Sequence, residues 1–333
     1  MTTTQESDVP RILGRRRAGP SDGSRRELYL VVAVVMIFVL VGTQDSSFAT
    51  FRSLNSILTD SVSMGLLAIA VSIVIIGGGI DISIASTLTA SAIVAGLVAQ
   101  HGGPVWLAIL AGVTCGALLG FINAVLIVVL GIQPIVATLA TMGIFRGLLT
   151  QTTKDLAVND LPLGFLAVGQ DKALHVPIPV WIFGAVILGA ILLMRYTGIG
   201  RLLYAIGNNQ AACRRAGMRV DLVIASSYVL CGAVAGLAGV LFAARNATVV
   251  AQSGTGLELA AIAAVVVGGV SITGGRGTVH GAAIAAVLIA SITAAMVTLG
   301  IRAAWQDAGV GATIVVAVVI FALSERSKEE PHV

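Results

Sequence analysis

Long apolar runs, separated by short polar segments, constrain the fold of this chain more than any other feature. Runs near the roughly 20-residue length of a membrane-spanning helix recur about ten times. They lie near residues 28–43, 55–77, 84–99, 104–130, 134–150, 177–194, 221–244, 257–272, 279–300 and 305–323. Only 11% of the residues are charged, too few to coat a soluble globule, so lipid must surround most of the surface. The sequence therefore predicts an all-α polytopic membrane protein with about ten transmembrane helices, some of them broken at glycine-rich segments.

The basic residues predict the orientation in the membrane. An even number of spans puts both termini on one side. Placing that side inside leaves roughly 14 of the 20 basic residues in the cytoplasm, the asymmetry expected of cytoplasmic loops. We then expect a disordered basic cytoplasmic tail at 1–27, a transmembrane domain at 28–323, a cytoplasmic tail at 324–333, and a large external loop at 151–176. A signal peptide is the competing interpretation of the first run, but no clear small-x-small cleavage site follows it.

The longest basic, glycine-punctuated segment is 195–219. Within it, Asn208 can cap a short helix over 209–216, and Gly217 can end that helix in the left-handed conformation. Arginines gather at the C-terminal end of this helix, where the helix dipole favours cations. The segment is either a solvated loop between two membrane helices or a docking helix that passes force to a soluble partner.

Two glycine-rich segments interrupt the apolar pattern. One, at 76–83, joins the second and third runs, and the other, at 267–277, joins the eighth and ninth. Aligning Gly77 with Gly268 also pairs Ile93 with Ile284, a weak internal echo. Such an echo suits a transporter built from two related halves. Close helix packing through small residues is the alternative explanation.

The motifs of a chemical active site are missing from the sequence. The glycine-rich segment 274–277 lacks the Lys-Ser/Thr ending of a Walker A motif, and no predicted strand precedes it. The four histidines are scattered, and the three cysteines show neither a disulfide framework nor a metal-binding spacing. We therefore expect no catalytic residue, no metal and no cofactor in this chain. The basic residues lie between apolar runs rather than on one face, which argues against nucleic-acid binding.

Among the ionisable residues in or beside predicted spans, four are weighed here: Asp81, Arg146, Glu258 and Asp307. Charge in a bilayer is costly and usually has a function. All four fall near span ends, where water helps, and Glu258 and Asp307 are placed to stabilise helix N-termini. We favour a structural role over direct substrate contact, and no carboxylate is placed for a mid-span proton relay.

Five stretches, in order within about residues 50–320, carry a family resemblance. They are Gly-Gly-Ile-Asp-Ile-Ser at 78–83, Pro-Ile-Val-Ala-Thr-Leu at 134–139 with Arg-Gly at 146–147, Leu-Tyr-Ala-Ile-Gly-Asn-Asn-Gln-Ala-Ala at 203–212, the segment 256–269, and Gly-Gly-Arg-Gly-Thr-Val at 274–279. Together they resemble the membrane permease subunit of bacterial ABC sugar importers of the ribose, xylose and arabinose type, relatives of branched-chain amino acid permeases. The chain departs from the family pattern at 215–218 and at His280, which leaves the individual substrate open.

The resemblance implies a subunit without its own ATPase, in keeping with the missing Walker motif. Such a permease resides in the bacterial cytoplasmic membrane and pairs with a second, identical or similar permease subunit. It binds two cytosolic ATP-binding subunits, which hold ATP and Mg²⁺, and receives solute from a periplasmic or lipid-anchored binding protein. The region 28–323 is then the permease domain, with 195–219 as its coupling loop.

The same resemblance and the polar pattern nominate three groups of residues. The coupling residues are Asn208, Asn209, Gln210, Arg214, Arg215 and Gly217. The structural or gating residues are Gly78, Gly79, Asp81, Ser83, Glu258, Gly274, Gly275 and Arg276. The candidates for the translocation path are Asn123, Gln133, Thr138 and Thr141, for each of which an interhelical hydrogen bond is the alternative role.

Two other classes of membrane protein fit parts of the pattern. An ion-gradient-driven secondary transporter of a small polar solute is opposed by the scarcity of mid-span carboxylates. A structural or receptor subunit that transports nothing is the other class. Within the ABC class the cargo is open among ribose, another pentose or deoxyhexose, a furanose sugar, a sugar alcohol, and a sugar-like signal such as autoinducer-2.

Overall fold

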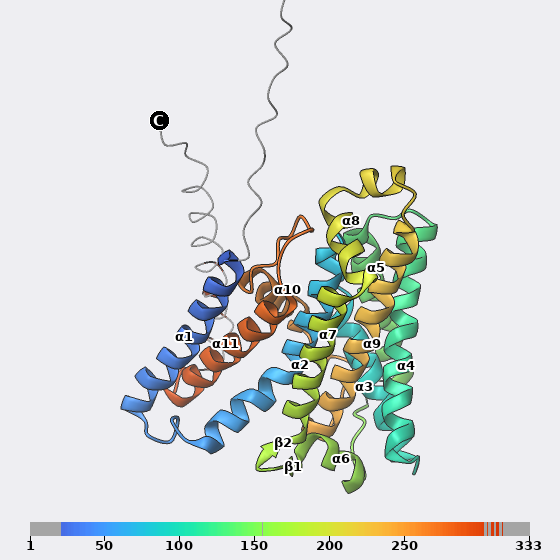
Figure 1. The fold of residues 1–333 in the computed structure, drawn as a ribbon. Coiled ribbons are helices and arrows are strands. Elements are labelled where there is room, and N and C mark those ends of the chain that lie inside the picture. The colour runs from blue at the N-terminus through green and yellow to red at the C-terminus, as the bar shows by residue number, and fades with distance from the viewer. Residues whose placement is uncertain are drawn as a thin grey trace, which may run out of the picture.

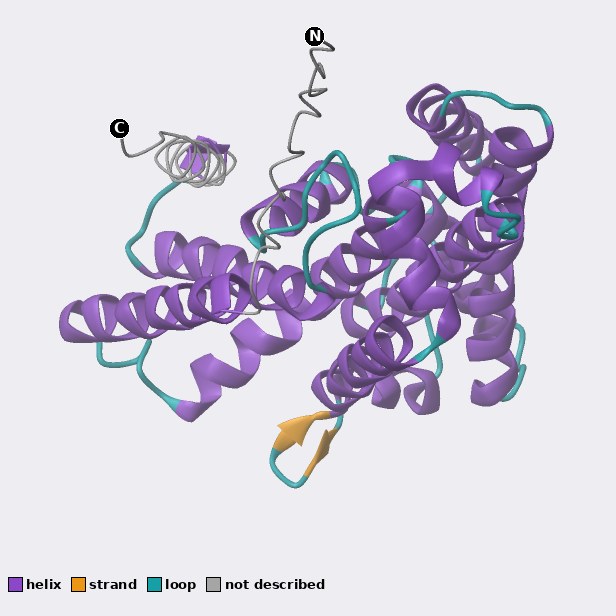
Figure 2. Ribbon diagram, turned by 45° about the horizontal axis from the view of Figure 1, so that its top comes forward, coloured by secondary structure: helices purple, strands orange, loops and turns teal. Residues whose placement is uncertain are grey.

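The structure is a computed structural model that describes residues 21–154 and 156–302, together with residues 305, 308, 309, 311, 312 and 315. The described part is built from helices (Figure 1). They are α1 (Ser21–Gln44), α2 (Phe51–Ile76), α3 (Ile84–Gln100), α4 (Val105–Ala124), the π-helical η1 (Val125–Val129), α5 (Pro134–Thr153), α6 (Leu163–Gln170), α7 (Ile178–Tyr196), α8 (Gly198–Arg215), α9 (Val220–Asn246), α10 (Leu257–Val267) and α11 (Val279–Thr298). Strands β1 (Lys172–Ala173) and β2 (Val176–Pro177) pair antiparallel in a small hairpin at the edge of the helices (Figure 2).

The predicted all-α character is confirmed, and the first nine apolar runs each coincide with a helix. Among the described residues, six helices are long and apolar enough to cross a membrane: α1, α2, α4 with η1, α7, α9 and α11. The apolar helices α3 and α10 are shorter. The tenth run, 305–323, lies mostly outside the described residues, as do the tail 324–333 and residues 1–20 of the predicted tail 1–27. Residues 21–27 of that tail are not disordered but form the start of α1. The number of about ten spans and the cytoplasmic termini therefore stay predictions.

One predicted boundary was wrong. The run 257–272 is helical only to Val267, because the next two glycines form a turn. The predicted loop 151–176 contains α6 and β1. It also pairs with the end of α9, where Val158 and Val249 exchange backbone hydrogen bonds of 2.8 and 3.0 Å.

Glycines bring α4 and α9 into backbone contact. Gly112, Gly116 and Gly120 recur every four residues and so share one face of α4. Gly232 and Gly236 of α9 face them, and a Cβ atom at Gly116 would collide with the carbonyl oxygen of Gly232. In lipid the hydrophobic effect does not drive helices together, so van der Waals contact between closely packed backbones stabilises the helix pair instead. The abundance of small residues thus serves helix packing here.

Helix α2 lies at the centre of the bundle and is enclosed by α7, α9, α10 and α11. Its second half, 66–76, is almost wholly buried. Thr50 caps its start by accepting a hydrogen bond of 3.2 Å from the Ser53 amide. Helix α8 and the loop 271–278 lie at one end of the bundle, whereas α6 and the hairpin lie at the other (Figure 1). We call these the α8 end and the hairpin end.

Helices α2 and α10 terminate in the same way. Gly78 (φ +87°) donates from its amide to Ile75 O at 2.9 Å, and Gly269 (φ +88°) does the same to Val266 O at 2.9 Å. The following amides, of Gly79 and Val270, each donate to the carbonyl five residues earlier, at 3.0 and 3.1 Å. This is the Schellman pattern of a glycine-ended helix. The alignment of Gly77 with Gly268 therefore corresponds to two helix ends with the same hydrogen-bond pattern.

The likeness stops at this turn. Helix α3 begins seven residues after Gly77 (84 − 77), whereas α11 begins eleven residues after Gly268 (279 − 268). Ile93 and Ile284 therefore occupy different positions along their helices, and their pairing in the sequence alignment was wrong. The extra residues in the second segment include the glycine-rich sequence 274–277.

Candidate functional site

The short helix predicted within 195–219 is present, but its cap is Asn209. Helix α8 is broken at this residue, because Asn209 has non-helical backbone angles (φ −160°, ψ 89°). Its Oδ1 accepts a hydrogen bond of 2.9 Å from the Ala212 amide, which begins a second short helix. The prediction that Asn208 caps this helix was therefore wrong by one residue. The side chain of Asn208 is engaged elsewhere.

The predicted end of this helix is confirmed. Gly217 is left-handed (φ +74°), and its amide donates to Arg214 O at 3.0 Å. Arg214 also pairs with Asp221 at the start of α9, with Nη1 3.0 Å from Oδ2. Both side chains are about half exposed, so the pair contributes little stability. Asn209, Gln210 and Arg215 are likewise exposed on this outer side of α8.

Hydrogen bonds join the first half of α8 to the loop 271–278, and that loop to the end of α2. Asn208 Nδ2 donates to Tyr204 O at 2.7 Å and to Gly275 O at 3.0 Å. Tyr204 donates its hydroxyl hydrogen to Gly277 O at 2.8 Å. The Gly275 amide donates to Ile76 O, the last residue of α2, at 2.9 Å. We call this set, with Gly207, the inner junction.

The inner junction needs glycine because three backbones meet there. A Cβ atom at Gly207 would collide with Ile76 O and with the Gly275 amide. Gly274 and Gly275 have φ of +83° and +72°, which side chains other than glycine rarely adopt. Burial raises the pKa of the Tyr204 phenol above its usual value, so the hydroxyl keeps its proton and remains a donor. The predicted gating glycines 274 and 275 thus lie against Gly207 and Asn208 of α8.

A second polar cluster lies inside the bundle, beyond the α2 turn. Asp81 Oδ1 accepts from the Ser83 amide at 2.9 Å and from the Ser83 hydroxyl at 2.7 Å. Cys231 of α9 contacts Asp81 Oδ2, with the sulfur 3.7 Å away. Only 2% of Asp81 is exposed, so the expectation that it lies beside interfacial water was wrong. The carboxylate instead ties the α2–α3 connection to α9.

This buried polar network continues into α4 and α5. Asn123 Nδ2 donates to Ser83 Oγ at 2.8 Å, and Asn123 Oδ1 accepts from the Thr141 hydroxyl at 2.7 Å. Thr138 donates to Pro134 O at 2.9 Å and lies 3.3 Å from Ile80 O. The network therefore brings together two predicted groups, the gating residues Asp81 and Ser83 and three of the four path candidates.

The path candidates differ in exposure. Asn123, Thr138 and Thr141 are at most 2% exposed, and their polar side-chain atoms bond within the chain. Gln133, just before α5, is exposed and has no place in the buried network. Asn123 and Thr141 thus join α4 to α5, whereas Thr138 bonds within α5 and lies beside the α2–α3 connection.

Arg146 and Glu258 lie apart from both clusters. Arg146 of α5 donates to Ala251 O and Ser253 O at 3.2 Å each and to Thr255 Oγ1 at 2.8 Å, which anchors the α9–α10 connection. Glu258 lies in the first turn of α10, as predicted, and accepts from the Gly256 amide at 3.1 Å. Arg276 is exposed on the loop 271–278, and Asp307 lies outside the described residues.

Two contacts had no counterpart in the sequence reasoning. Glu27 of α1 accepts from Thr278 Oγ1 at 3.0 Å and lies 2.7 Å from His280 Nε2, which joins the start of α1 to the start of α11. The unusual His280 was a signal for this contact, although its partner was unreadable. Asp60 and Arg245 form an ion pair between residues 185 positions apart, for which the sequence holds no signal.

Comparison with known proteins decides the family. A family model described as "Branched-chain amino acid transport system / permease component" matches residues 53–323. The chain belongs to this permease family. The match contains both clusters described above and every predicted site residue, so the predicted resemblance to bacterial ABC permeases is confirmed. A multi-pass permease of the inner membrane accounts for the long apolar helices.

Similar permeases are known by function. The autoinducer 2 import system permease protein LsrC of Salmonella typhi is 34% identical over 298 residues, covering 90% of this chain and 86% of the relative. The ribose import permease protein RbsC of Escherichia coli strain K12 is 33% identical over 297 residues, covering 87% of this chain and 92% of the relative. No solved structure gives a significant match.

Proposed function

We propose that this chain is the membrane-spanning subunit of an ABC importer for a sugar or sugar-like solute. Separate ATP-binding subunits, which hold ATP and Mg²⁺, would power it, and an extracytoplasmic binding protein would supply the solute. Support comes from the near full-length similarity to permeases named for ribose and for autoinducer 2 import. The shared chemistry of those two cargoes, a small polyhydroxylated molecule, is the substrate class proposed here.

The proposed orientation puts the α8 end in the cytoplasm. That end carries the basic residues of 195–219, and Arg276 lies on the neighbouring loop. Cytoplasmic loops carry an excess of Lys and Arg, which supports this choice. The hairpin end, with Lys172, then faces the outside. Both termini are cytoplasmic in this proposal.

The inner junction is the observation that carries the coupling proposal. The exposed, basic outer part of α8 offers a surface to an ATP-binding subunit, and Asn209 separates it from the part that contacts the membrane helices. A displacement of the outer part is passed through Asn208 to Gly275, beyond α10, and from Gly275 to Ile76 at the end of α2. The permease then opens alternately to each side of the membrane.

In this proposal the translocation path runs between this permease subunit and a second one. The hydrogen bonds of Asn123, Thr138 and Thr141 favour a structural role for those residues, which leaves Gln133 as the exposed candidate for the path.

Reconstitution tests the proposal. The permease, its ATP-binding subunits and its binding protein are placed in lipid vesicles, and uptake of labelled ribose and autoinducer 2 is followed with and without ATP. We expect concentrative uptake of at least one solute only when all components and ATP are present. Accumulation by the chain alone across a proton or sodium gradient would instead identify a secondary transporter and refute the proposal.

The coupling role has its own test. The segment 208–215 is replaced by a Gly/Ser linker of the same length in the complete importer. We expect loss of uptake together with loss of the ATPase stimulation that the loaded binding protein causes. If both are retained, α8 does not couple the subunits.

A further inference from the structure

A cavity opens at the hairpin end of the bundle, away from the inner junction. Its volume is about 800 Å³, and it lies between the first half of α2, the start of α10 and the end of α11. Small-molecule sites in proteins have volumes of roughly 300–1,000 Å³. The cavity is thus large enough for a small solute.

Hydroxyl groups line this cavity from α2, from α11 and from the connection before α10. They belong to Ser53, Ser56, Thr255, Thr293 and Thr298. Apolar side chains, among them Met64 and Ile289, complete the wall. A few polar groups on an apolar wall match a small polyol, which has hydroxyls at its edge and C–H groups on its faces.

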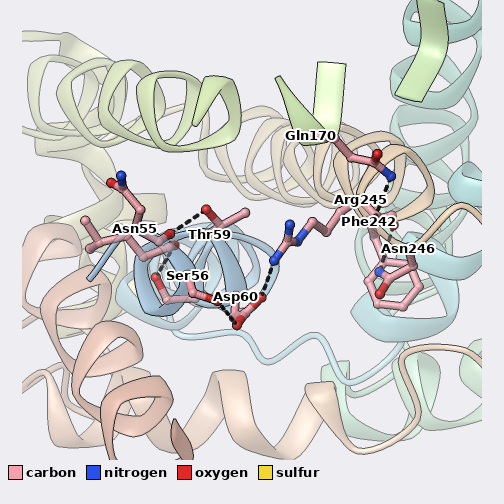
Figure 3. Close-up of polar contacts among 10 residues, drawn as sticks. Asn55, Ser56, Thr59, Asp60, Gln170, Phe242, Arg245 and Asn246 are labelled. Carbon is pink, nitrogen blue, oxygen red and sulfur yellow. Dashed lines mark hydrogen bonds and ion pairs between the residues drawn. The ribbon is translucent and has the colours of Figure 1, made fainter. Parts of the chain in front are cut away.

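One charged pair stands at the edge of the cavity. Asp60 lines it, and Arg245, at the end of α9, reaches the carboxylate with Nη2 3.2 Å from Oδ1. Figure 3 shows Ser56 and Asp60 on one face of α2, with Arg245 extended toward Asp60 from the other side. Ser56 Oγ also lies 3.4 Å from Asp60 Oδ2, so a hydroxyl and a carboxylate act together.

The exposure of this pair argues for an aqueous cavity. The Asp60 side chain is 59% exposed in the isolated chain, and that of Arg245 is 40% exposed. Asp60 nevertheless lies within the apolar membrane helix 51–76. Exposed charges on an apolar membrane helix are costly against lipid, so they favour water, a polar solute or another protein chain in front of them.

We propose that this cavity is the outer receiving site of the permease for a polyhydroxylated solute. The free lone pairs of the Asp60 carboxylate accept hydrogen bonds from solute hydroxyls, and Arg245 holds the carboxylate in place while donating to solute oxygens. The hydroxyl side chains complete the contacts. This inference rests on the proposed function and on its orientation, and it goes further in naming the site.

Cysteine accessibility tests the site without relying on transport. Ser56→Cys, on the cavity wall, is compared with Ser72→Cys, which is on the same helix but fully buried. Cells carrying the complete importer are treated from outside with a membrane-impermeant methanethiosulfonate, and the unsubstituted chain corrects for its native thiols. We expect Ser56→Cys to react at least about tenfold faster than Ser72→Cys, because thiol reactivity follows access to solvent. Millimolar ribose should slow the reaction of Ser56→Cys.

Two results would overturn the proposal at this stage. Equal, slow reaction of both thiols would mean that another chain or lipid closes the cavity. Fast reaction of Ser56→Cys that neither ribose nor a panel of other pentoses and sugar alcohols slows would mean that the cavity holds water but receives no polyol.

Uptake kinetics then test the role of the charged pair. Asp60→Asn is compared with Asp45→Asn, which removes an exposed carboxylate near the same end of the membrane but outside the cavity. In reconstituted importer we expect Asp60→Asn to raise the apparent KM for ribose about tenfold while ATPase stimulation at saturation is kept. Asp45→Asn should match the wild type.

The two proposals fail in different ways. An unchanged KM in Asp60→Asn, with normal wild-type uptake, refutes the receiving site alone. If Asp60→Asn abolishes both the pairing of the two permease subunits and uptake, the cavity is filled by a contact between protomers, which also refutes the receiving site. Absence of ATP-driven uptake by the wild-type assembly refutes the proposed function, whereas the thiol protection result still decides whether polyols bind.

Discussion

Asn208 and Gly275 are joined by a hydrogen bond of 3.0 Å across 67 residues of sequence, from the last helical residue before the α8 break to the turn beyond α10. The Asn208 side-chain amide also donates a hydrogen bond to Tyr204 O, and the Gly275 backbone amide donates one to Ile76 O. A side chain and a backbone amide therefore connect three elements that meet at one end of the bundle.

Replacement of Asn208 by alanine removes both of its hydrogen bonds and leaves the Gly275 carbonyl without that donor. A typical hydrogen bond contributes about 1 kcal/mol, so we expect uptake per ATP hydrolysed to fall roughly fivefold. The measurement is the ratio of uptake to ATPase rate in vesicles. Asn159→Ala, an exposed change in the connection between α5 and α6, is the control. An unchanged ratio in Asn208→Ala would show that the inner junction carries no coupling.

Replacement of Gly207 by alanine forces a methyl group against Ile76 O and the Gly275 amide. Overpacking of this kind costs about 1–3 kcal/mol, so the thermal stability of the purified chain in detergent should fall clearly. Gly198→Ala, in the same helix but with open space around the added carbon, should leave stability within about 0.5 kcal/mol of the wild type. Equal melting curves for the two variants would contradict the close packing described here.

Replacement of Gly78 or of Gly269 by alanine tests the matched turns. Each has a left-handed backbone, which costs an L-residue about 1–2 kcal/mol. We expect similar losses of stability from the two single variants. The comparison variant is Gly143→Ala, in the α5 helix with nothing within 4 Å of the added carbon, which should be neutral or stabilising. Sharply different effects at the two turns would count against their equivalence.

Replacement of Asn123 by leucine removes the centre of the buried polar network. Ser83 Oγ loses a donor and the Thr141 hydroxyl loses its acceptor, and an unsatisfied buried group costs about 1–3 kcal/mol. We expect a lower melting temperature, with the apparent KM for solute unchanged in the protein that stays folded. Thr152→Val, on an exposed face of α5, controls for loss of a hydroxyl. A changed KM with unchanged stability would instead restore Asn123 to the translocation path.

Replacement of Tyr204 by phenylalanine removes the bond to Gly277 O. Because burial raises the phenol pKa, its stabilising contribution is complete at and below the ordinary tyrosine pKa of about 10 and is lost as the pH rises through the higher folded-state value. The stability difference between wild type and Tyr204→Phe should therefore be constant at neutral pH and shrink in strong alkali. Melting curves as a function of pH measure it. A difference that already disappears near neutral pH would contradict the buried, protonated phenol.

The helices were predictable because lipid allows few alternatives. A chain with so few charges must satisfy its backbone internally, and apolar runs of membrane length then become helices. The run 84–99 accordingly appears as α3, Ile84–Gln100. The end of α10 was missed because glycines 268 and 269 are apolar enough to extend a run but form a turn.

Site residues were predictable only where their role depends on neighbours in the sequence. Gly217 ends its helix through its own backbone, so its role could be inferred from sequence. The choice between Asn208 and Asn209 as the cap depends on Gly275, which sequence reasoning could not place beside them. Asp60 and Arg245 meet only because α2 and α9 pack together, and neither has a local pattern that marks a partner.

The matched turns at the ends of α2 and α10 bear on the proposed coupling. Gly275 is bound by Asn208 on one side and by Ile76 on the other. Under that proposal, a push on α8 would reach two helices that end in the same geometry. A small displacement at the α8 end would then change the width of the cavity between these helices at the hairpin end.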